Sequence, residues 1–223
     1  MTRFFAGLDL GQAADYTALS ILEKLQPEGD EKEHERRRRN RQNVYHIRYL
    51  ERVRGEPYTA IVSKVVKMMS KLKDDANLVV DQTGCGRPVF DMFVDAGLKP
   101  KPIGVSIHGG DSVTHDGGNY RVPKRDLVGV LQVLLQSGRL KVAQKLELGP
   151  ILQQEMLNFK QKIDPVTAHD SYSAWRDQDH DDLVLAVALA AWWGEQFVEP
   201  IKMTFSVTPV VRRYEDIINW RPF

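Results

Sequence analysis

Hydrophobic positions in the first quarter of the chain follow the pattern of β-strands. Residues 4–10 and 16–24 are short runs rich in apolar side chains, separated by turn-forming residues. Residues 44–54 alternate apolar and polar side chains, which is typical of a strand with one buried face. Residues 27–43 are charged and polar and cannot supply a buried face. The pattern predicts three antiparallel strands, with an exposed loop or hairpin tip before the third.

The spacing then becomes helical and alternates with further strands. Residues 57–72 repeat apolar side chains at helical intervals, and residues 87–96 read as a helix that stops at Gly97. Residues 78–81 and 102–107 are short apolar strands. Strand–helix–strand units favour parallel pairing, so these strands should extend the sheet in parallel.

The second half of the chain is predicted to contain one surface loop and three helices. Residues 108–121 are Gly-rich and polar, as surface loops are. Residues 146–160 are amphipathic, and residues 183–193 form the longest uninterrupted apolar run. That run is well short of the ~20 residues that a membrane span requires, so it predicts a buried helix. Residues 124–137 place one apolar stripe on a helix, formed by Leu127, Val130, Leu131, Leu134 and Leu135.

The composition fits one large globular domain. The chain has 223 residues, a mass of 25.4 kDa and a formal net charge of +1, so its overall charge gives no argument for a nucleic-acid partner. Cys85 is the single cysteine and cannot form an internal disulfide, which favours a reducing cytoplasm. We expect residues 1–196 to form the domain and residues 197–223 to form a C-terminal appendage.

Acidic residues follow two of the predicted strands and precede the last predicted helix. Asp9 and Asp81 each end a short apolar run, and Asp179, Asp181 and Asp182 lie directly before the apolar helix. A carboxylate at the end of a buried strand is costly to desolvate and needs a cation or a hydrogen-bond donor. Mg²⁺ and Mn²⁺ bind hard oxygen ligands and need only a few from the protein. The pattern therefore predicts a metal centre.

The expected topology brings these aspartates together. If the strands that bear Asp9 and Asp81 are neighbours, both side chains project at one sheet edge, where α/β folds place their ligands. A helix that begins at Asp181 and Asp182 can aim one carboxylate at that edge, because adjacent helical residues point about 100° apart. Two metal ions about 3.5 to 4 Å apart can hydrolyse a phosphodiester without a serine or cysteine nucleophile.

Each aspartate taken alone also fits an ordinary structural role. Asp9 fits a turn before Gly11, and Asp81 fits a cap on the turn that leads to Gly84. The aspartates before the last helix suit the positive end of its dipole. Only the joint pattern favours metal binding over these roles.

The order and spacing of these motifs resemble the nuclease domain of the large terminase subunit of tailed bacteriophages. The resemblance covers roughly residues 3–196. It is carried by Gly7-Leu8-Asp9-Leu10-Gly11 with Asp15-Tyr16-Thr17-Ala18, by Val79-Val80-Asp81-Gln82-Thr83-Gly84-Cys85-Gly86, by Val122-Pro123-Lys124-Arg125-Asp126-Leu127-Val128 with Gly138-Arg139-Leu140, and by His180-Asp181-Asp182-Leu183-Val184-Leu185-Ala186. Each motif alone has low specificity, and their combination is more specific.

The resemblance implies an RNase H-like α/β fold, with a mixed central sheet and helices on both faces. It implies two Mg²⁺ or Mn²⁺ ions, held by Asp9, Asp81 and one or both of Asp181 and Asp182, and cleavage of double-stranded DNA during viral genome packaging. The implied partners are DNA, the packaging ATPase domain, the portal and the small terminase subunit, in the cytoplasm of a bacterial host at phage assembly sites. The chain has no Gly-x-x-x-x-Gly-Lys-Ser/Thr loop, so it is expected to be the nuclease part without the motor.

Several cationic residues are candidate DNA contacts. The run Arg36, Arg37, Arg38 and Arg39 could release counterions from phosphates, although Glu31, Glu33 and Glu35 would balance it in a solvated loop. The resemblance places Lys124 and Arg125 near DNA. His180 could contact a phosphate or move a proton, or simply begin the helix.

Other functions compatible with the motifs remain open at the level of sequence. A Holliday-junction resolvase or a transposase-like nuclease would share the fold, and a DNA-docking module could keep the fold without the chemistry. An actin-like kinase or ATPase is disfavoured, because it needs two large lobes and 223 residues are too few.

Overall fold

The computed structural model describes residues 2–11, 15–25, 43–72, 76–162 and 180–197. These residues form one eight-stranded sheet in the order β6-β7-β5-β4-β1-β2-β3-β8. The strands are β1 Thr2–Asp9, β2 Tyr16–Leu25, β3 Val44–Arg54, β4 Asn77–Asp81, β5 Ile103–His108, β6 Thr114–Asp116, β7 Asn119–Pro123 and β8 Leu140–Val142. The helices are α2 Tyr58–Met69, α3 Gly86–Asp95, α4 Lys124–Gln136, α5 Gly149–Lys162 and α6 Asp182–Gln196.

The pairing confirms the predicted mixed sheet. Strands β1, β2 and β3 are antiparallel to one another. Strand β4 pairs in parallel with β1, and β5 pairs in parallel with β4. The crossover helices α2 and α3 permit this change of direction, since parallel strands need a long connection.

The expectation of a plain surface loop at residues 108–121 is wrong in part. Strands β6 and β7 form a hairpin within this segment, and β7 adds to the sheet in parallel with β5. Gly117 and Gly118 form the turn with φ values of +54° and +88°, a conformation that glycine adopts without steric cost. A glycine pair between short strands is thus a hairpin signal within a polar segment. Strand β8 was also not predicted, and it pairs with β3.

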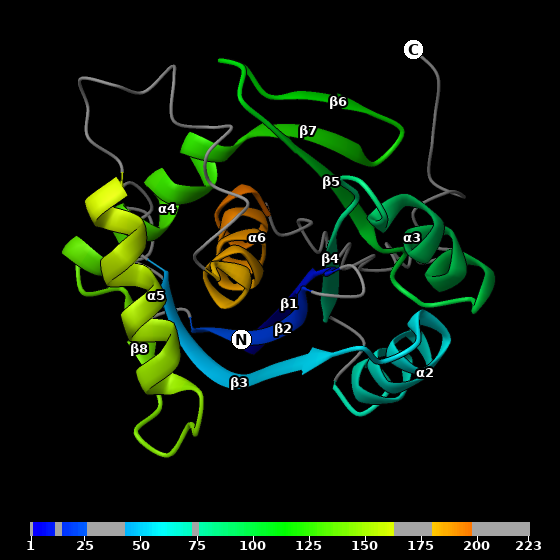
Figure 1. Cartoon of the computed structure of the whole chain (residues 1–223), viewed down its shortest axis with the longest axis horizontal. Coiled ribbons are helices and arrows are strands. Elements are labelled where there is room, and N and C mark those ends of the chain that lie inside the picture. Colours follow the sequence, from blue (N-terminus) through cyan, green and yellow to red (C-terminus); the bar gives the residue numbers. More distant parts are fainter. Residues whose placement is uncertain (1, 12–14, 26–42, 73–75, 163–179, 198–223) are drawn as a thin grey trace, which may run out of the picture.

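Helices cover both faces of the sheet and enclose two apolar cores (Figure 1). Helices α2 and α3 pack on one face, where Val65 and Phe93 are buried against β1 and β4. Helices α4, α5 and α6 pack on the other face, around which the sheet curves. The predicted stripe on α4 holds for Leu127, Leu131 and Leu134, whereas Leu135 is exposed.

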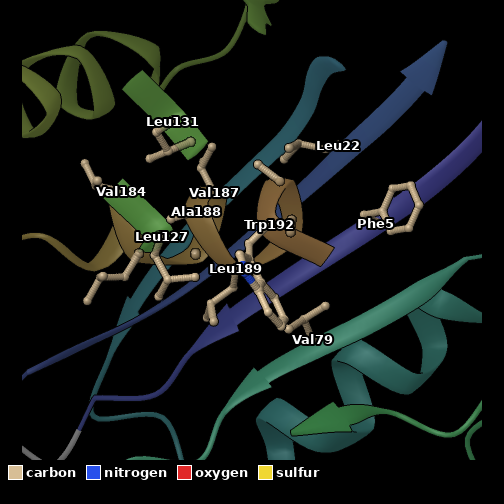
Figure 2. Close-up of a cluster of buried hydrophobic side chains, with 14 of the residues drawn as sticks. Phe5, Leu22, Val79, Leu127, Leu131, Val184, Val187, Ala188, Leu189 and Trp192 are labelled. Atoms are coloured by element: carbon tan, nitrogen blue, oxygen red, sulfur yellow. The ribbon is translucent and has the colours of Figure 1, made fainter. Parts of the chain in front are cut away.

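Helix α6 is the centre of the second core (Figure 2). Its residues from Leu183 to Trp192 are all buried, as the uninterrupted apolar run predicted. The helix lies against β1 at Gly7, where an added Cβ would sit 2.0 Å from the carbonyl oxygen of Ala186. Gly7 therefore sets how closely α6 approaches the sheet.

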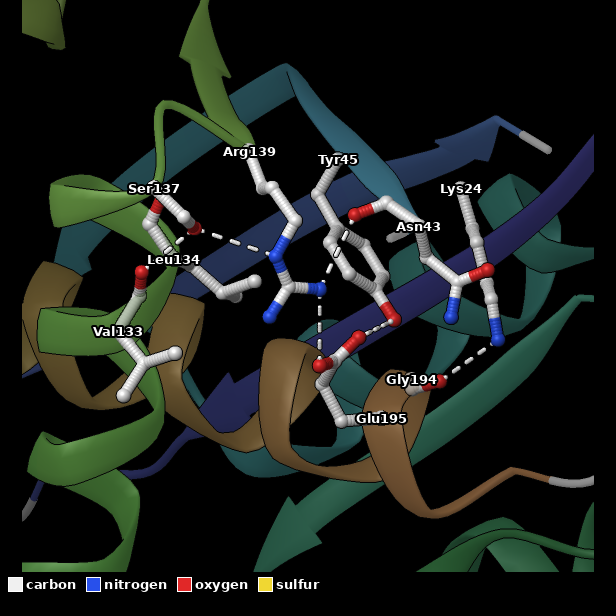
Figure 3. A network of polar contacts seen from close by, with 9 residues as sticks. All are labelled: Lys24, Asn43, Tyr45, Val133, Leu134, Ser137, Arg139, Gly194 and Glu195. Atoms are coloured by element: carbon white, nitrogen blue, oxygen red, sulfur yellow. Dashed lines mark hydrogen bonds and ion pairs between the residues drawn. The ribbon is translucent and has the colours of Figure 1, made fainter. Parts of the chain in front are cut away.

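Polar contacts fix the C-terminal end of α6 (Figure 3). Tyr45 on β3 donates a hydrogen bond of 2.8 Å to Glu195 Oε1, and Arg139 donates one of 3.0 Å to Glu195 Oε2. Lys24 on β2 donates to the carbonyl oxygen of Gly194 at 2.9 Å. These contacts use residues from three separate parts of the chain, so they hold α6 in a fixed axial position.

Several residues singled out from the sequence lie outside the described residues. They are residues 27–42, which include the arginine run at 36–39, Asp179, and residues 198–223 of the predicted appendage 197–223. Within the part of the chain that the structure describes, no helix is long and apolar enough to cross a membrane.

Candidate active site

Asp9 and Asp81 lie side by side at one edge of the sheet. Strands β1 and β4 are parallel neighbours, and their register pairs Leu8 with Val80, so the two aspartates follow at the next position. Side chains alternate along a strand, and Gly7 faces α6, so Asp9 faces α6 as well. Asp9 is only 9% exposed and Asp81 only 8%. The structure thus buries two carboxyl groups against the beginning of α6.

A turn fixes the direction of the Asp81 carboxylate. Its Oδ1 atom accepts hydrogen bonds from the backbone N–H of Thr83 at 2.7 Å and from the Thr83 hydroxyl at 2.6 Å. The same hydroxyl accepts a hydrogen bond of 2.8 Å from the N–H of Ile107 on β5. Asp81 therefore has the ordinary capping role as well, and this role orients it at the sheet edge.

Burial raises the pKa values of both carboxyl groups, and repulsion by the neighbouring carboxylates raises that of Asp9 further. Desolvation raises the pKa of Asp9 well above its usual value, and the charges of Asp81, Asp182 and Asp181 raise it further. Desolvation also raises the pKa of Asp81, against hydrogen bonds from Thr83 and Asp9 that lower it. The Lys124 cation lowers both pKa values in part. The four carboxyl groups are therefore electrostatically coupled at one site.

Asp181 and Asp182 each contact a cation from another element. Asp181 Oδ2 accepts a hydrogen bond of 2.9 Å from the Lys124 ammonium at the start of α4. Asp182 Oδ2 accepts one of 2.9 Å from the Arg52 guanidinium on β3. Desolvation raises the pKa of Asp182, and Arg52 opposes the shift. The two adjacent aspartates thus pair with cations from different elements.

Arg52 stands in an aromatic and charged environment. Its guanidinium lies 3.9 Å from the ring centroid of Tyr16 on β2. The imidazole of His180 packs edge-on against the same ring, and its Nδ1 lies 3.8 Å from Asp182 Oδ2. This cluster contacts Asp182, whereas Lys124 contacts Asp181.

The proposed DNA contacts fall into four groups. Lys124 belongs to the acidic site itself, where it pairs with Asp181. Arg125 is exposed and pairs with Asp111, so its guanidinium contacts the polar segment before β6. His180 has a side chain that is 56% exposed beside Asp182. The arginines at positions 36–39 lie outside the described residues.

The donor set suits a hard divalent cation. The four carboxylates offer oxygen ligands of the kind that Mg²⁺ and Mn²⁺ prefer. The charges of Lys124 and Arg52 partly neutralise the site and draw Asp181 and Asp182 towards themselves. Among the described residues, no three His, Cys, Asp or Glu side chains are grouped closely enough to hold a metal ion as they stand. Metal ligation by Asp181 or Asp182 would use the Oδ1 atom, because Oδ2 of each carboxylate pairs with a cation.

Comparison with solved structures identifies the fold. The crystal structure of the large terminase nuclease from thermophilic phage G20c superposes with a TM-score of 0.50 over 85% of this chain and 81% of that chain, at 18% identity. The fold is RNase H-like. RuvC from Thermus thermophilus superposes over 85% of this chain and 91% of its own, with a TM-score of 0.37 at 12% identity. No protein-family model and no curated protein matches the sequence.

Sequence reasoning missed two residues that surround the site of this RNase H-like chain. Arg52 lies on the third strand, and nothing in its alternation distinguishes it from a surface cation. Glu155 lies on α5 and is only 6% exposed. It follows the buried Leu152 by three residues, so it occupies the apolar face of its helix. A charged residue on that face is the one signal in the sequence that could have revealed it.

Proposed function

We propose that the chain is a metal-dependent endonuclease that hydrolyses phosphodiester bonds of double-stranded DNA. The observation that carries this proposal is the gathering of Asp9, Asp81, Asp181 and Asp182 at one edge of an RNase H-like sheet. Buried carboxyl groups with perturbed pKa values, such as those of Asp9 and Asp81, mark candidate functional sites. A purely structural cluster would gain stability from fewer buried charges.

The residues of the site suit this reaction. Two bound Mg²⁺ or Mn²⁺ ions would activate water and stabilise the leaving oxygen. Asp9 and Asp81 would hold them from fixed positions on β1 and β4, with Asp181 or Asp182 closing the site from α6. Lys124 would offer its ammonium to a DNA phosphate once it leaves Asp181, and the exposed His180 could contact the strand nearby.

We further propose that cutting serves viral genome packaging. The support is the order of the sequence motifs and the likeness to a protein described as a large terminase nuclease. The expected partners are then a packaging ATPase domain, a portal and a small terminase subunit. Residues 1–196 would be the nuclease domain, and residues 197–223 an appendage that packs on it or meets a partner. Co-purification with a portal or small subunit from the same genome tests this role.

Plasmid cleavage with Mn²⁺ tests the enzymatic proposal. We expect the wild-type chain to nick and linearise plasmid DNA, and Asp81→Asn to lose more than about 100-fold of that activity, since even indirect supporting residues of metal sites contribute 10–100-fold. Asparagine keeps an oxygen for the Thr83 hydrogen bonds, so the turn should survive. Asp95→Asn is the matched control, because Asp95 is exposed at the end of α3.

The outcomes separate the alternatives. Equal cleavage by the wild type and Asp81→Asn would contradict a metal role for this carboxylate. DNA binding without cleavage by either protein would favour a docking module. Turnover of ATP would instead favour a kinase-like reaction.

A further inference from the structure

Helix α6 begins inside the acidic site, yet neither adjacent aspartate caps it. An aspartate at a helix N-terminus commonly accepts hydrogen bonds from the first backbone N–H groups. Asp181 occupies the N-cap position of α6 and makes no such side-chain bond. Its carboxylate instead pairs with Lys124, and that of Asp182 pairs with Arg52. Another acceptor is therefore needed for the N-terminal N–H groups.

That acceptor is Glu155, which lies 28 residues earlier on α5. Its Oε2 atom accepts hydrogen bonds from the backbone N–H of Leu183 at 3.1 Å and of Val184 at 3.3 Å. The side chain is 6% exposed, so these bonds are shielded from water. A buried carboxylate is costly to desolvate, and a local aspartate could have capped the helix at lower cost.

Glu155 is also linked to Asp182 through Arg52, which contacts both carboxylates. Its Oε1 atom lies 3.3 Å from Nη1 of Arg52, whose Nη2 donates to Asp182 Oδ2 at 2.9 Å. Arg52 is itself held over the ring of Tyr16. Glu155 thus caps the backbone of the first turn of α6 and also forms an ion pair, without a hydrogen bond, with the cation that contacts the Asp182 carboxylate.

We propose that Glu155 is a positioning residue of the nuclease site. By capping α6 in place of the local aspartates, it leaves the carboxylates of Asp181 and Asp182 available for metal ligation. By pairing with Arg52, Glu155 limits the movement of the Arg52 guanidinium when the Asp182 side chain changes position. This inference rests on the function proposed above.

The alternative is that Glu155 only stabilises the fold, as any buried helix cap does. That role would lower stability on mutation without changing metal affinity beyond the effect of unfolding. The C-terminal end of α6 supplies a matched control, because Tyr45→Phe removes the hydrogen bond to Glu195 at the opposite end of the same helix. This control loosens α6 and leaves the acidic edge intact.

The experiment compares the wild-type chain with Glu155→Ala, Glu155→Gln and Tyr45→Phe. Urea unfolding gives the stability of each, and electron paramagnetic resonance gives Mn²⁺ affinity without DNA. We expect Glu155→Ala to weaken Mn²⁺ binding 10–100-fold, as the loss of a supporting residue does at other metal sites. Glu155→Gln keeps one acceptor oxygen but loses the charge that pairs with Arg52. Its Mn²⁺ affinity should therefore lie between those of the wild type and Glu155→Ala. Tyr45→Phe should bind Mn²⁺ as the wild type does.

A crystal structure of Glu155→Ala adds a readout that does not depend on metal. We expect the carboxylate of Asp181 or Asp182 to turn towards the freed N–H groups of Leu183 and Val184. Plasmid cleavage should show a lower kcat with little change in KM for DNA, because DNA contacts are left in place.

Each result bears on one proposal. Wild-type Mn²⁺ affinity in Glu155→Ala would overturn the positioning role, while the nuclease assignment would stand. If the alanine variant does not fold, wild-type affinity in Glu155→Gln overturns it instead. A wild-type chain that neither binds Mn²⁺ nor cuts DNA would contradict the proposed function itself.

Discussion

At the scale of single residues, the carboxylates of the site have different surroundings. Asp81 caps a turn through Thr83 and still faces Asp9, so its structural and proposed functional roles coexist. Asp181 and Asp182 have no capping role towards α6, and each neutralises a cation instead. The ordinary explanation by helix capping is therefore wrong for Asp181, because Glu155 performs that task.

Lys124→Met tests the counterion role of Lys124. The ion pair with Asp181 is partly buried, so we expect the free energy of unfolding in metal-free buffer at pH 7.5 to fall by about 1–3 kcal/mol. The loss should be smaller at pH 5, because the raised pKa values of Asp9 and Asp81 favour protonation of these carboxyl groups as the pH falls. Urea unfolding at both pH values measures this. An equal loss at both would contradict the electrostatic explanation.

At the scale of elements, the position of α6 determines whether the four aspartates of the candidate site can lie close together. Two of the proposed ligands, Asp181 and Asp182, lie at the N-terminus of the helix. Glu155 contacts the backbone at this end, and Tyr45 and Arg139 contact Glu195 at the C-terminal end. Its close approach to β1 depends on Gly7. A shift of α6 along or away from the sheet would separate Asp182 from Asp9.

Gly7→Ala should displace α6 from the sheet. The new Cβ would meet the backbone of Ala186, which cannot yield like a flexible side chain, so we expect a loss of about 3 kcal/mol in unfolding free energy. Gly129→Ala on α4 is the control, since nothing lies within 4 Å of its added Cβ. It should stabilise the chain by about 0.5–1 kcal/mol through helix propensity. Chemical denaturation compares the two, and similar values would show that close packing at Gly7 is unimportant.

At the scale of the whole molecule, folding in the absence of metal buries several carboxyl groups close to one another. Desolvation raises the pKa of Asp9, Asp81 and Asp182, and it raises that of Glu155 to about 7. The folded chain therefore holds protons at pH values where the unfolded chain has released them. By linkage, its stability must fall as the pH rises from about 4 to about 7.

Stability measurements between pH 5 and pH 7.5 test this coupling. Without metal we expect the free energy of unfolding to decrease over this range, with up to about 3 kcal/mol attributable to Glu155 and absent in Glu155→Gln. Mn²⁺ at about 100 times its Kd should restore about 2.7 kcal/mol at pH 7.5 and less at pH 5, where protons compete for the carboxylates. Greater metal-free stability at pH 7.5 than at pH 5 would contradict the coupling.

The sequence by itself predicted most of the strands and helices and named the aspartates of the candidate site. Alternating and helical periods placed the strands and helices, because burial of one face imposes those periods whatever the partner. Because side chains alternate along a strand, Asp9 lies on the same face of β1 as Gly7, which contacts α6. The hairpin β6–β7 escaped prediction because β6 is short and exposed and β7 buries only its last two residues, so the segment has little apolar signal.

Only the tertiary structure decided which charges meet. Lys124, Arg52 and Glu155 come from three elements that lie far apart in the sequence, and their contacts with the start of α6 depend on how α4, β3 and α5 pack around it. The periodicity of apolar residues indicates which face of an element is buried, but it does not indicate which other elements pack against that face. The aspartates could therefore be named from the sequence, whereas the residues that contact them depend on how the elements pack in the folded structure.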